Sequence, residues 1–152
     1  MKISSDYRDL LRDLNAAGVR YLIVGGYAVM IYTEPQFTKD LDLWIEPSEE
    51  NAQVLFGALV RFGAPLVGIR AADFTEPETF YQIGVDPVRV DILTSIPGID
   101  FTAAWERRLT VDFGGVPAYV ISKEDLLRSK RSTGRKRDRI HTKSLEKRDK
   151  RR

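Results

Sequence analysis

The segment VGGYAVMIYTEPQFTKDLDLWIE, residues 24–46, decides how the rest of this chain is interpreted. Gly25 and Gly26 directly follow an apolar run that is rich in β-branched and aromatic residues, as a buried strand is. After thirteen intervening residues, Asp40 and Asp42 stand on either side of a leucine in a second apolar run. This order predicts a strand, a glycine pair, a short helix and an acidic strand in close succession.

Hydrophobic periodicity on either side of this segment predicts an alternation of helices and strands. Strands are expected over residues 19–24, 38–46, 80–85, 88–93, 109–113 and 116–121. Helices are expected over residues 4–17, 27–32, 49–62, 99–107 and 123–132. The last two strands flank Gly114-Gly115, whose turn chemistry is that of a hairpin. The order predicts an α/β (α+β) fold, a mixed sheet with helices packed on it.

The length of 152 residues and the 43% hydrophobic share predict one folded domain with a sizeable core. We expect this domain over residues 1–134 and a basic C-terminal tail, partly helical or disordered, over residues 135–152. The chain has no cysteine, which excludes a disulfide framework and a cysteine zinc site and suits a cytoplasmic protein. A charged N-terminus and short apolar runs argue against a signal peptide and a membrane span.

The net charge of +2 hides an uneven distribution along the chain. From Lys123 onward the chain holds 14 Lys+Arg and 5 Asp+Glu, a net +9, while the preceding 122 residues carry a net −7. An acidic body with a basic tail suggests a polyanion partner such as a nucleic acid. The alternative is that the tail is only a solvated, partly disordered segment.

Asp40 and Asp42 are the first candidates for chemistry. Residues two apart in a strand point to the same side, so both carboxylates share one face while Leu41 and Leu43 point into the core. Two neighbouring carboxylates repel each other, and a half-buried carboxylate without a partner is costly. A hard dication such as Mg²⁺, which prefers carboxylate and phosphate oxygens, resolves both problems. The alternative is a pair of solvated acids at a strand edge.

Asp91 lies inside the apolar run 88–93, where an acidic side chain needs a partner. If this strand lies beside the strand of Asp40 and Asp42, three carboxylates converge in an arrangement that can hold two metal ions. One ion would activate an attacking hydroxyl, and the other would bind a triphosphate and the leaving pyrophosphate. Asp91 is then the general base or a ligand of the activating ion. The alternative is an ion pair between Asp91 and Arg89 on the same strand face.

Gly25 and Gly26 stand between a strand and a helix, where glycines let backbone N–H groups approach an anion closely. The helix N-terminus adds a partial positive charge. This arrangement predicts a cradle for the phosphates of a nucleotide, and the alternative is a tight turn. Trp44, two residues after Asp42, is a candidate for stacking on a base, with packing in the core as its alternative.

The order of an apolar residue, a glycine pair, an Asp-x-Asp strand and a later acidic strand resembles the signature of the nucleotidyltransferase superfamily of the DNA polymerase β type. The residues that carry the resemblance are Val24-Gly25-Gly26, Asp40-Leu41-Asp42-Leu43 and Asp91. The resemblance implies a minimal nucleotidyltransferase fold with three catalytic, metal-binding carboxylates. It also implies Mg²⁺-dependent transfer of a nucleoside monophosphate from an NTP to a hydroxyl.

A closer likeness is to small bacterial proteins of the abortive-infection and toxin–antitoxin type. These share the GG-x-A opening, here residues 25–28, and a Thr or Ser shortly before the Asp pair, here Thr38. They also share a late lysine, here Lys130, and a Gly-Arg-x-x-Asp segment, here residues 134–138. By that resemblance Thr38 and Lys130 belong to the nucleotide site, and Asp138 orients Lys130 or completes the site. The alternative for Lys130 is a solvated lysine on the last helix.

Three functions stay open on the sequence. The first is an active Mg²⁺-dependent nucleotidyltransferase that uses an NTP such as ATP on RNA, for example tRNA, or on protein, as a toxin–antitoxin component with a protein partner. The second is a non-catalytic module of the same fold that binds a nucleotide or a partner protein. The third is an RNA-binding protein that uses only the basic residues 123–152.

Overall fold

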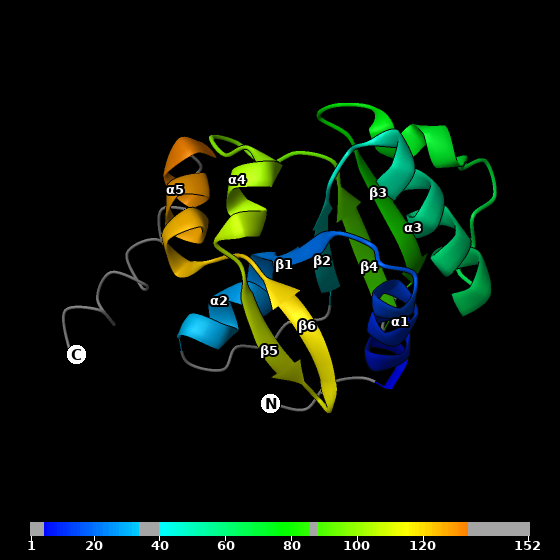
Figure 1. The fold of residues 1–152 in the computed structure, drawn as a ribbon, viewed down its shortest axis with the longest axis horizontal. Helices are drawn as coiled ribbons and strands as arrows, with labels where there is room; N and C mark the ends of the chain where they lie inside the picture. The colour runs from blue at the N-terminus through cyan, green and yellow to red at the C-terminus, as the bar shows by residue number, and fades with distance from the viewer. Residues whose placement is uncertain (1–4, 34–39, 86–87, 134–152) are drawn as a thin grey trace.

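The computed structural model describes residues 5–33, 40–85 and 88–133 (Figure 1). Within these ranges the strands are β1 (Tyr21–Val24), β2 (Asp40–Ile45), β3 (Phe80–Val85), β4 (Val88–Leu93), β5 (Leu109–Phe113) and β6 (Val116–Val120). The α-helices are α1 (Ser5–Ala16), α2 (Gly25–Tyr32), α3 (Glu49–Phe62), α4 (Phe101–Glu106) and α5 (Lys123–Thr133), and one 3₁₀ helix is η1 (Ala71–Thr75). The predicted mixed sheet with helices packed on it is confirmed.

The six strands form one mixed sheet in the order β3-β4-β2-β1-β6-β5. Strand β2 runs antiparallel to β1 and parallel to β4, so the strand of Asp40 and Asp42 lies directly beside the strand of Asp91. Strand β1 is parallel to β6, and the β5–β6 hairpin forms one edge of the sheet. The topology therefore places the two acidic strands next to each other near the middle of the sheet.

Helices cover the sheet from two sides (Figure 1). Helices α1 and α3 pack against each other on the right of this view, and α4 and α5 lie on the left. Side chains of β2 alternate between the two faces: Leu41 and Leu43 are fully buried, whereas Asp40 and Asp42 remain partly exposed on the opposite face. The same alternation that buries the leucines leaves the two carboxylates accessible.

Trp44 lies on the carboxylate face of β2 but is only 1% exposed. Its ring packs edge-on against Phe101 of α4, with ring centroids 5.0 Å apart, and Phe101 stacks on Trp105. The alternative of packing in the core is therefore confirmed for Trp44, and stacking on a base is wrong, because α4 covers the indole. Helix α4 thus closes this face of the sheet beyond the carboxylates.

Local signals set the ends of α3 as the sequence predicts. The Ser48 hydroxyl accepts a hydrogen bond from the backbone N–H of Asn51, and Gly63, with φ of 91°, ends the helix in the left-handed conformation. Helix α5 is capped in the same way, because the Ser122 hydroxyl accepts from the N–H of Asp125 at 3.1 Å. Caps of this kind depend only on residues a few positions apart.

Several boundaries differ from the expectation by one or two residues, and two of these differences concern β1 and α2. Strand β1 begins at Tyr21 because the Asn51 side chain bonds both the N–H of Arg20, at 2.8 Å, and its carbonyl oxygen, at 3.0 Å. The second helix begins at Gly25 rather than at Tyr27, so the glycine pair forms its first turn. The glycines therefore start the helix itself and do not form a separate loop before it.

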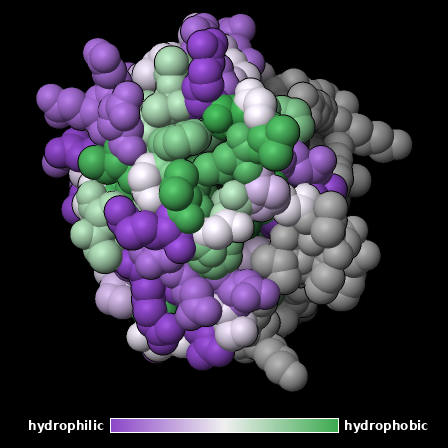
Figure 2. All heavy atoms as spheres, turned by 90° about the vertical axis from the view of Figure 1, so that its right-hand side faces the viewer, coloured by the Kyte–Doolittle hydropathy of each residue, from purple (hydrophilic) through white to green (hydrophobic). Residues whose placement is uncertain are grey.

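The face toward the viewer in Figure 2, the right-hand side of Figure 1, carries apolar surface at its centre and polar side chains around it. Helix α3 and strand β3 lie on this side of the molecule. Within the described part of the chain, no helix combines the length and hydropathy that a bilayer crossing requires.

Candidate active site

Strand register brings two of the three predicted carboxylates side by side. Asp42 of β2 is the direct neighbour of Asp91 of β4 in the parallel ladder, and Val24 of β1 is the neighbour of Asp42 on the other side. Neighbours in one row of a sheet point to the same face, so the two carboxylates lie against each other. The side chain of Asp91 is 14% exposed, whereas that of Asp40 is 29% exposed. Asp91 is therefore more enclosed than Asp40.

Asp42 bears the electrostatic cost of this arrangement. Burial, and then the carboxylates of Asp91 and Asp40, raise the pKa of Asp42 to about 7, while the charge of Lys130 on α5 acts to lower this pKa. A carboxylate with such a pKa is only partly ionised at neutral pH, because burial and its acidic neighbours outweigh the effect of Lys130. The structure thus places Lys130 within electrostatic reach of the cluster.

The glycine pair meets the carboxylates at Gly25. This residue has φ of +67°, and a Cβ built on it would overlap Asp42 Oδ2 and lie 2.9 Å from Asp42 Cγ. Only glycine fits here without displacing the carboxylate. The N-cap residue of α2 is Val24, which makes no side-chain hydrogen bond to the helix. The first backbone N–H groups of α2, including that of Gly26, therefore have no capping side chain.

Arg89 supplies the positive charge nearest to the carboxylates on the β4 side. Its Nη2 lies 2.6 Å from Asp40 Oδ2 and 3.5 Å from Asp91 Oδ2. Gln82 of β3, oriented with its carbonyl oxygen toward Arg89, accepts from Nε at 2.7 Å and from Nη1 at 2.8 Å. The predicted alternative pairing of Arg89 with Asp91 is therefore present, but the shorter contact is with Asp40.

The cluster fits a divalent cation by the chemistry of its oxygens. Asp91 Oδ1 is buried and has no hydrogen-bond partner, and the neighbouring Asp42 is held in an environment that opposes its charge. A hard dication satisfies both, since it takes carboxylate oxygens as ligands. Within residues 5–33, 40–85 and 88–133, no three acidic or histidine side chains are already grouped around a metal position, and Asp40 is paired with Arg89.

Helix α5, which carries Lys130, is fixed by a buried carboxylate. Asp125 is 0% exposed and accepts from Arg107 Nη2 at 2.8 Å and Nε at 3.0 Å, and from Arg128 Nη1 at 3.0 Å. The two bonds from Arg107 tie α5 to the residue after α4, and α5 also packs against α2. The position of Lys130 relative to Asp42 therefore depends on this ion pair.

Two residues singled out in the sequence cannot be placed in this way. Thr38 lies between α2 and β2 in the chain, and Asp138 follows α5, and both fall outside the described residues. Conversely, the contacts of Gln82 and Arg89 with the cluster were not predicted beyond the Arg89–Asp91 pair. Alternation along β3 places Gln82 on the opposite face from Tyr81 and Ile83. This pattern indicates a contact with the cluster only once the pairing of β3 with β4 is known.

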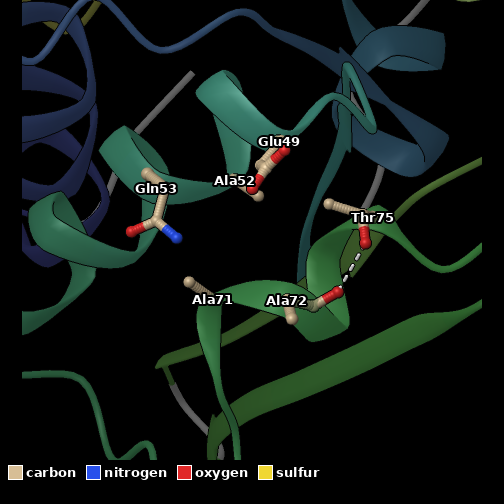
Figure 3. A pocket seen from close by; sticks show the side chains of 6 residues that line it. All are labelled: Glu49, Ala52, Gln53, Ala71, Ala72 and Thr75. Atoms are coloured by element: carbon tan, nitrogen blue, oxygen red, sulfur yellow. Dashed lines mark hydrogen bonds between the residues drawn. The ribbon is translucent and has the colours of Figure 1, made fainter.

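A separate cavity of about 260 Å³ lies between α3 and η1. Figure 3 shows that Glu49, Ala52 and Gln53 line it from α3, and Ala71, Ala72 and Thr75 from η1. The Thr75 hydroxyl donates to the Ala72 carbonyl at 2.6 Å and so is already used within η1. This cavity shares no residue with the carboxylate cluster.

The raised pKa of Asp42 predicts how the metal-free protein responds to pH. Between the ordinary pKa of 3.8 and about 7, the folded state keeps a proton that the unfolded chain has lost, so the free energy of unfolding falls as pH rises through this window. We expect the Tm in a chelator to fall more steeply from pH 4.5 to 7.5 in the wild type than in Asp42→Asn. Parallel Tm curves for the two proteins would contradict the shifted pKa.

A family model described as "Nucleotidyl transferase of unknown function (DUF2204)" matches residues 3–151. No curated protein matches the chain. TM1012 from Thermotoga maritima, described as a nucleotidyltransferase, has a similar structure, with a TM-score of 0.62 and 18% identity over 96% of this chain and 91% of that one.

Two further solved structures have the same fold. The lincosamide antibiotic adenylyltransferase LnuA, with lincomycin bound, gives a TM-score of 0.59 and 16% identity over 95% of this chain and 96% of that one. ANT(2")-Ia, in complex with adenylyl-2"-tobramycin, gives 0.50 and 11% identity over 93% and 95%. At these identities the likeness establishes a shared fold.

Proposed function

Because this chain belongs to the nucleotidyl transferase family DUF2204, we propose that it transfers a nucleoside monophosphate from an NTP such as ATP to a hydroxyl group. Membership confirms the nucleotidyltransferase resemblance that the glycine pair and the aspartates carry, and with it the class of a transferase enzyme. The observation that carries the proposed reaction is the position of Asp42 and Asp91, side by side in the ladder and next to the start of α2 at Gly25.

Asp40, Asp42 and Asp91 would hold two Mg²⁺ ions, which when bound supply positive charge to the triphosphate and favour loss of the proton from the acceptor hydroxyl. Asp91, with one buried oxygen unpaired, takes that proton. The acceptor oxygen then bonds to the α-phosphorus, the bond between the α-phosphorus and the bridging oxygen breaks, and pyrophosphate leaves. The chain's carboxylates thus orient the reactants and remove one proton.

The phosphates would be bound at the other side of Asp42. Backbone N–H groups at Gly25 and Gly26 point from the N-terminus of α2, where an anion is favoured by the helix dipole. Lys130 adds a positive charge from α5, within reach of Asp42. By the resemblance stated above, Thr38 and Asp138 complete the nucleotide site.

The charge distribution favours RNA as the acceptor. The chain from Lys123 onward carries a net +9, and its first helix, α5, lies against α2 and holds Lys130 near the carboxylates. A polyanion is attracted to such a segment, and its hydroxyl would then be delivered close to the site. We place the reaction in the cytoplasm, under the control of a protein partner as in toxin–antitoxin pairs.

A small molecule with a free hydroxyl is the second candidate acceptor. This chain covers 96% of LnuA, whose structure holds lincomycin, so a domain of this size can carry out adenylyl transfer to a small molecule. The protein would then resemble LnuA in substrate class as well as in fold.

Incubation with each α-labelled NTP, Mg²⁺ and total RNA tests the proposal directly, with a panel of hydroxyl-bearing antibiotics in a parallel reaction. We expect label in RNA with the wild type and none with Asp91→Asn. Label only in a small molecule would replace RNA by the second candidate. Nucleotide binding by calorimetry without transfer to any acceptor would indicate a non-catalytic module. RNA binding that is unchanged in Asp42→Asn and absent without residues 134–152 would indicate a tail-only binder.

Replacing Lys130 with methionine should weaken NTP binding. The change removes a positive charge near Asp42, and loss of one charge-assisted contact to phosphate, about 1.5–3 kcal/mol, corresponds to a KM roughly 10- to 100-fold higher. Arg131→Met removes the same charge from the next, exposed position of α5 and serves as the matched control. Equal KM values for the two variants would contradict a phosphate contact by Lys130.

A further inference from the structure

Arg89 is held at the carboxylate cluster by contacts from three strands. Asp40 of β2 and Asp91 of β4 supply carboxylate oxygens at 2.6 and 3.5 Å, and the amide oxygen of Gln82 on β3 accepts from two other guanidinium nitrogens. The carbonyl oxygen of Arg89 accepts from the Tyr7 hydroxyl of α1 at 2.9 Å, so its backbone is tied down independently. The guanidinium can therefore leave by a side-chain rotation while β4 stays in place.

The oxygens that Arg89 occupies are the ones that a metal would need. Asp40 Oδ2 and Asp91 Oδ2 both face its Nη2, and they belong to two of the three carboxylates assigned to Mg²⁺ above. Both acids are shielded from solvent more than the surface pair Asp9–Arg12, whose side chains are 56% and 59% exposed. Shielding strengthens the attraction of Arg89 for these oxygens and makes its loss without a replacement cation costly.

We propose that Arg89 is a resident counter-cation of the metal-free protein, which a divalent cation must displace from Asp40 and Asp91 in order to bind. This inference rests on the proposed function, because it takes the two acids as metal ligands. A cation already seated in the cluster lowers the affinity for free metal. A guanidinium also pairs well with phosphate oxygens, so an NTP that arrives with the metal offers Arg89 a new partner. Displacement therefore favours joint loading of metal and nucleotide.

Calorimetry with Mn²⁺ alone tests the displacement. Arg89→Gln frees the two carboxylates, and we expect a Kd at least about tenfold lower than in the wild type. Arg131→Gln removes one positive charge from an exposed position of α5, so we expect a change of less than about threefold if displacement rather than net charge decides. Arg12→Gln, which breaks an exposed pair remote from the cluster, should leave Kd unchanged.

The same proteins give a second readout in thermal unfolding. In a chelator, Arg89→Gln should have a lower Tm than the wild type, because Asp40 and Asp91 lose their counter-charge, and saturating Mn²⁺ should raise its Tm by more than it raises that of the wild type. A Kd for Mn²⁺ that is equal or higher in Arg89→Gln overturns the proposal and leaves the metal assignment standing. No Mn²⁺ binding to either protein overturns both.

If Arg89→Gln does not fold, the wild type alone decides. The Nε–H of Arg89 donates to Gln82, which should give it a resolved signal in a ¹⁵N–¹H spectrum, assigned by its loss in Arg89→Lys. Titration with Mg²⁺ should shift or broaden this signal over the same concentrations at which the protein binds the ion. A signal that stays unchanged while Mg²⁺ binds overturns the proposal.

Discussion

Replacing Asp42 with asparagine is expected to lower the rate of nucleotidyl transfer by roughly 1,000-fold or more and at the same time to stabilise the metal-free protein. The rate falls because Asp42 stands between Asp91 and the first turn of α2, where metal and triphosphate meet in the proposed reaction. Stability rises because burial and the charges of Asp91 and Asp40 raise the pKa of Asp42 to about 7, and the amide removes the ionised form that causes this cost.

The gain in stability follows from the size of that shift. A carboxylate whose pKa is raised by about three units costs a few kcal/mol when ionised, which we reduce to about 1–2 kcal/mol for its partial exposure, or roughly 3–8 °C in Tm for a chain of this length. Single-turnover rates and Tm in a chelator at pH 8 measure the two effects. Asp9→Asn, at an exposed acid paired with Arg12, is the control for both. A less stable Asp42→Asn protein would contradict the electrostatic account.

The contrast with Asp125 shows why Asp42 marks a site. Asp125 is fully buried, yet it accepts three hydrogen bonds from the guanidinium groups of Arg107 and Arg128, which surround it with opposite charge. Asp42 is less buried, but its neighbour in the ladder is another carboxylate, Asp91, which raises its pKa. In the proposed reaction, the metal ion would supply at Asp42 the opposite charge that the two arginines supply at Asp125.

Local signals in the sequence were enough to predict most of the elements. Helix α3 was expected over residues 49–62 and occupies Glu49–Phe62, because Ser48 and Gly63 act within a few residues of the helix ends. The strand faces also followed from alternation, since Leu41 and Leu43 are buried while the acids between and before them are not. These features depend only on residues that are close together in the chain, so they can be predicted from the sequence.

Pairing between distant strands was not visible in the same way. That β2 and β4 lie side by side could be assumed, but not predicted, from the sequence. The parallel register that places Asp42 opposite Asp91 depends on the arrangement of all the strands in the sheet. The same register places Arg89 opposite Asp40, which lies 49 positions earlier in the chain and is its ion-pair partner. From the sequence, the only partner suggested for Arg89 was Asp91, two residues along the same strand. Gln82 joins from β3 by a further pairing.

The clash between Gly25 and Asp42 leads to the sharpest expectation for the glycine pair. Gly25→Ala should lower transfer by roughly 100-fold or more, because the new methyl group overlaps Asp42 Oδ2 and must displace the carboxylate from its position beside Asp91. It should also cost about 1–3 kcal/mol of stability, since φ of +67° strains any residue with a Cβ.

Gly18→Ala separates backbone strain from damage to the site. Gly18 has φ of +72°, close to that of Gly25, but an added Cβ meets nothing within 4 Å. This variant should therefore lose about 1 kcal/mol of stability and keep its transfer rate. If the two variants lose activity equally, strain alone explains Gly25→Ala. If Gly25→Ala keeps its activity, the close approach of α2 to Asp42 is not needed for transfer. The expected result, a loss of transfer in Gly25→Ala only, would show that transfer requires the close approach of the glycine pair to the carboxylate of Asp42.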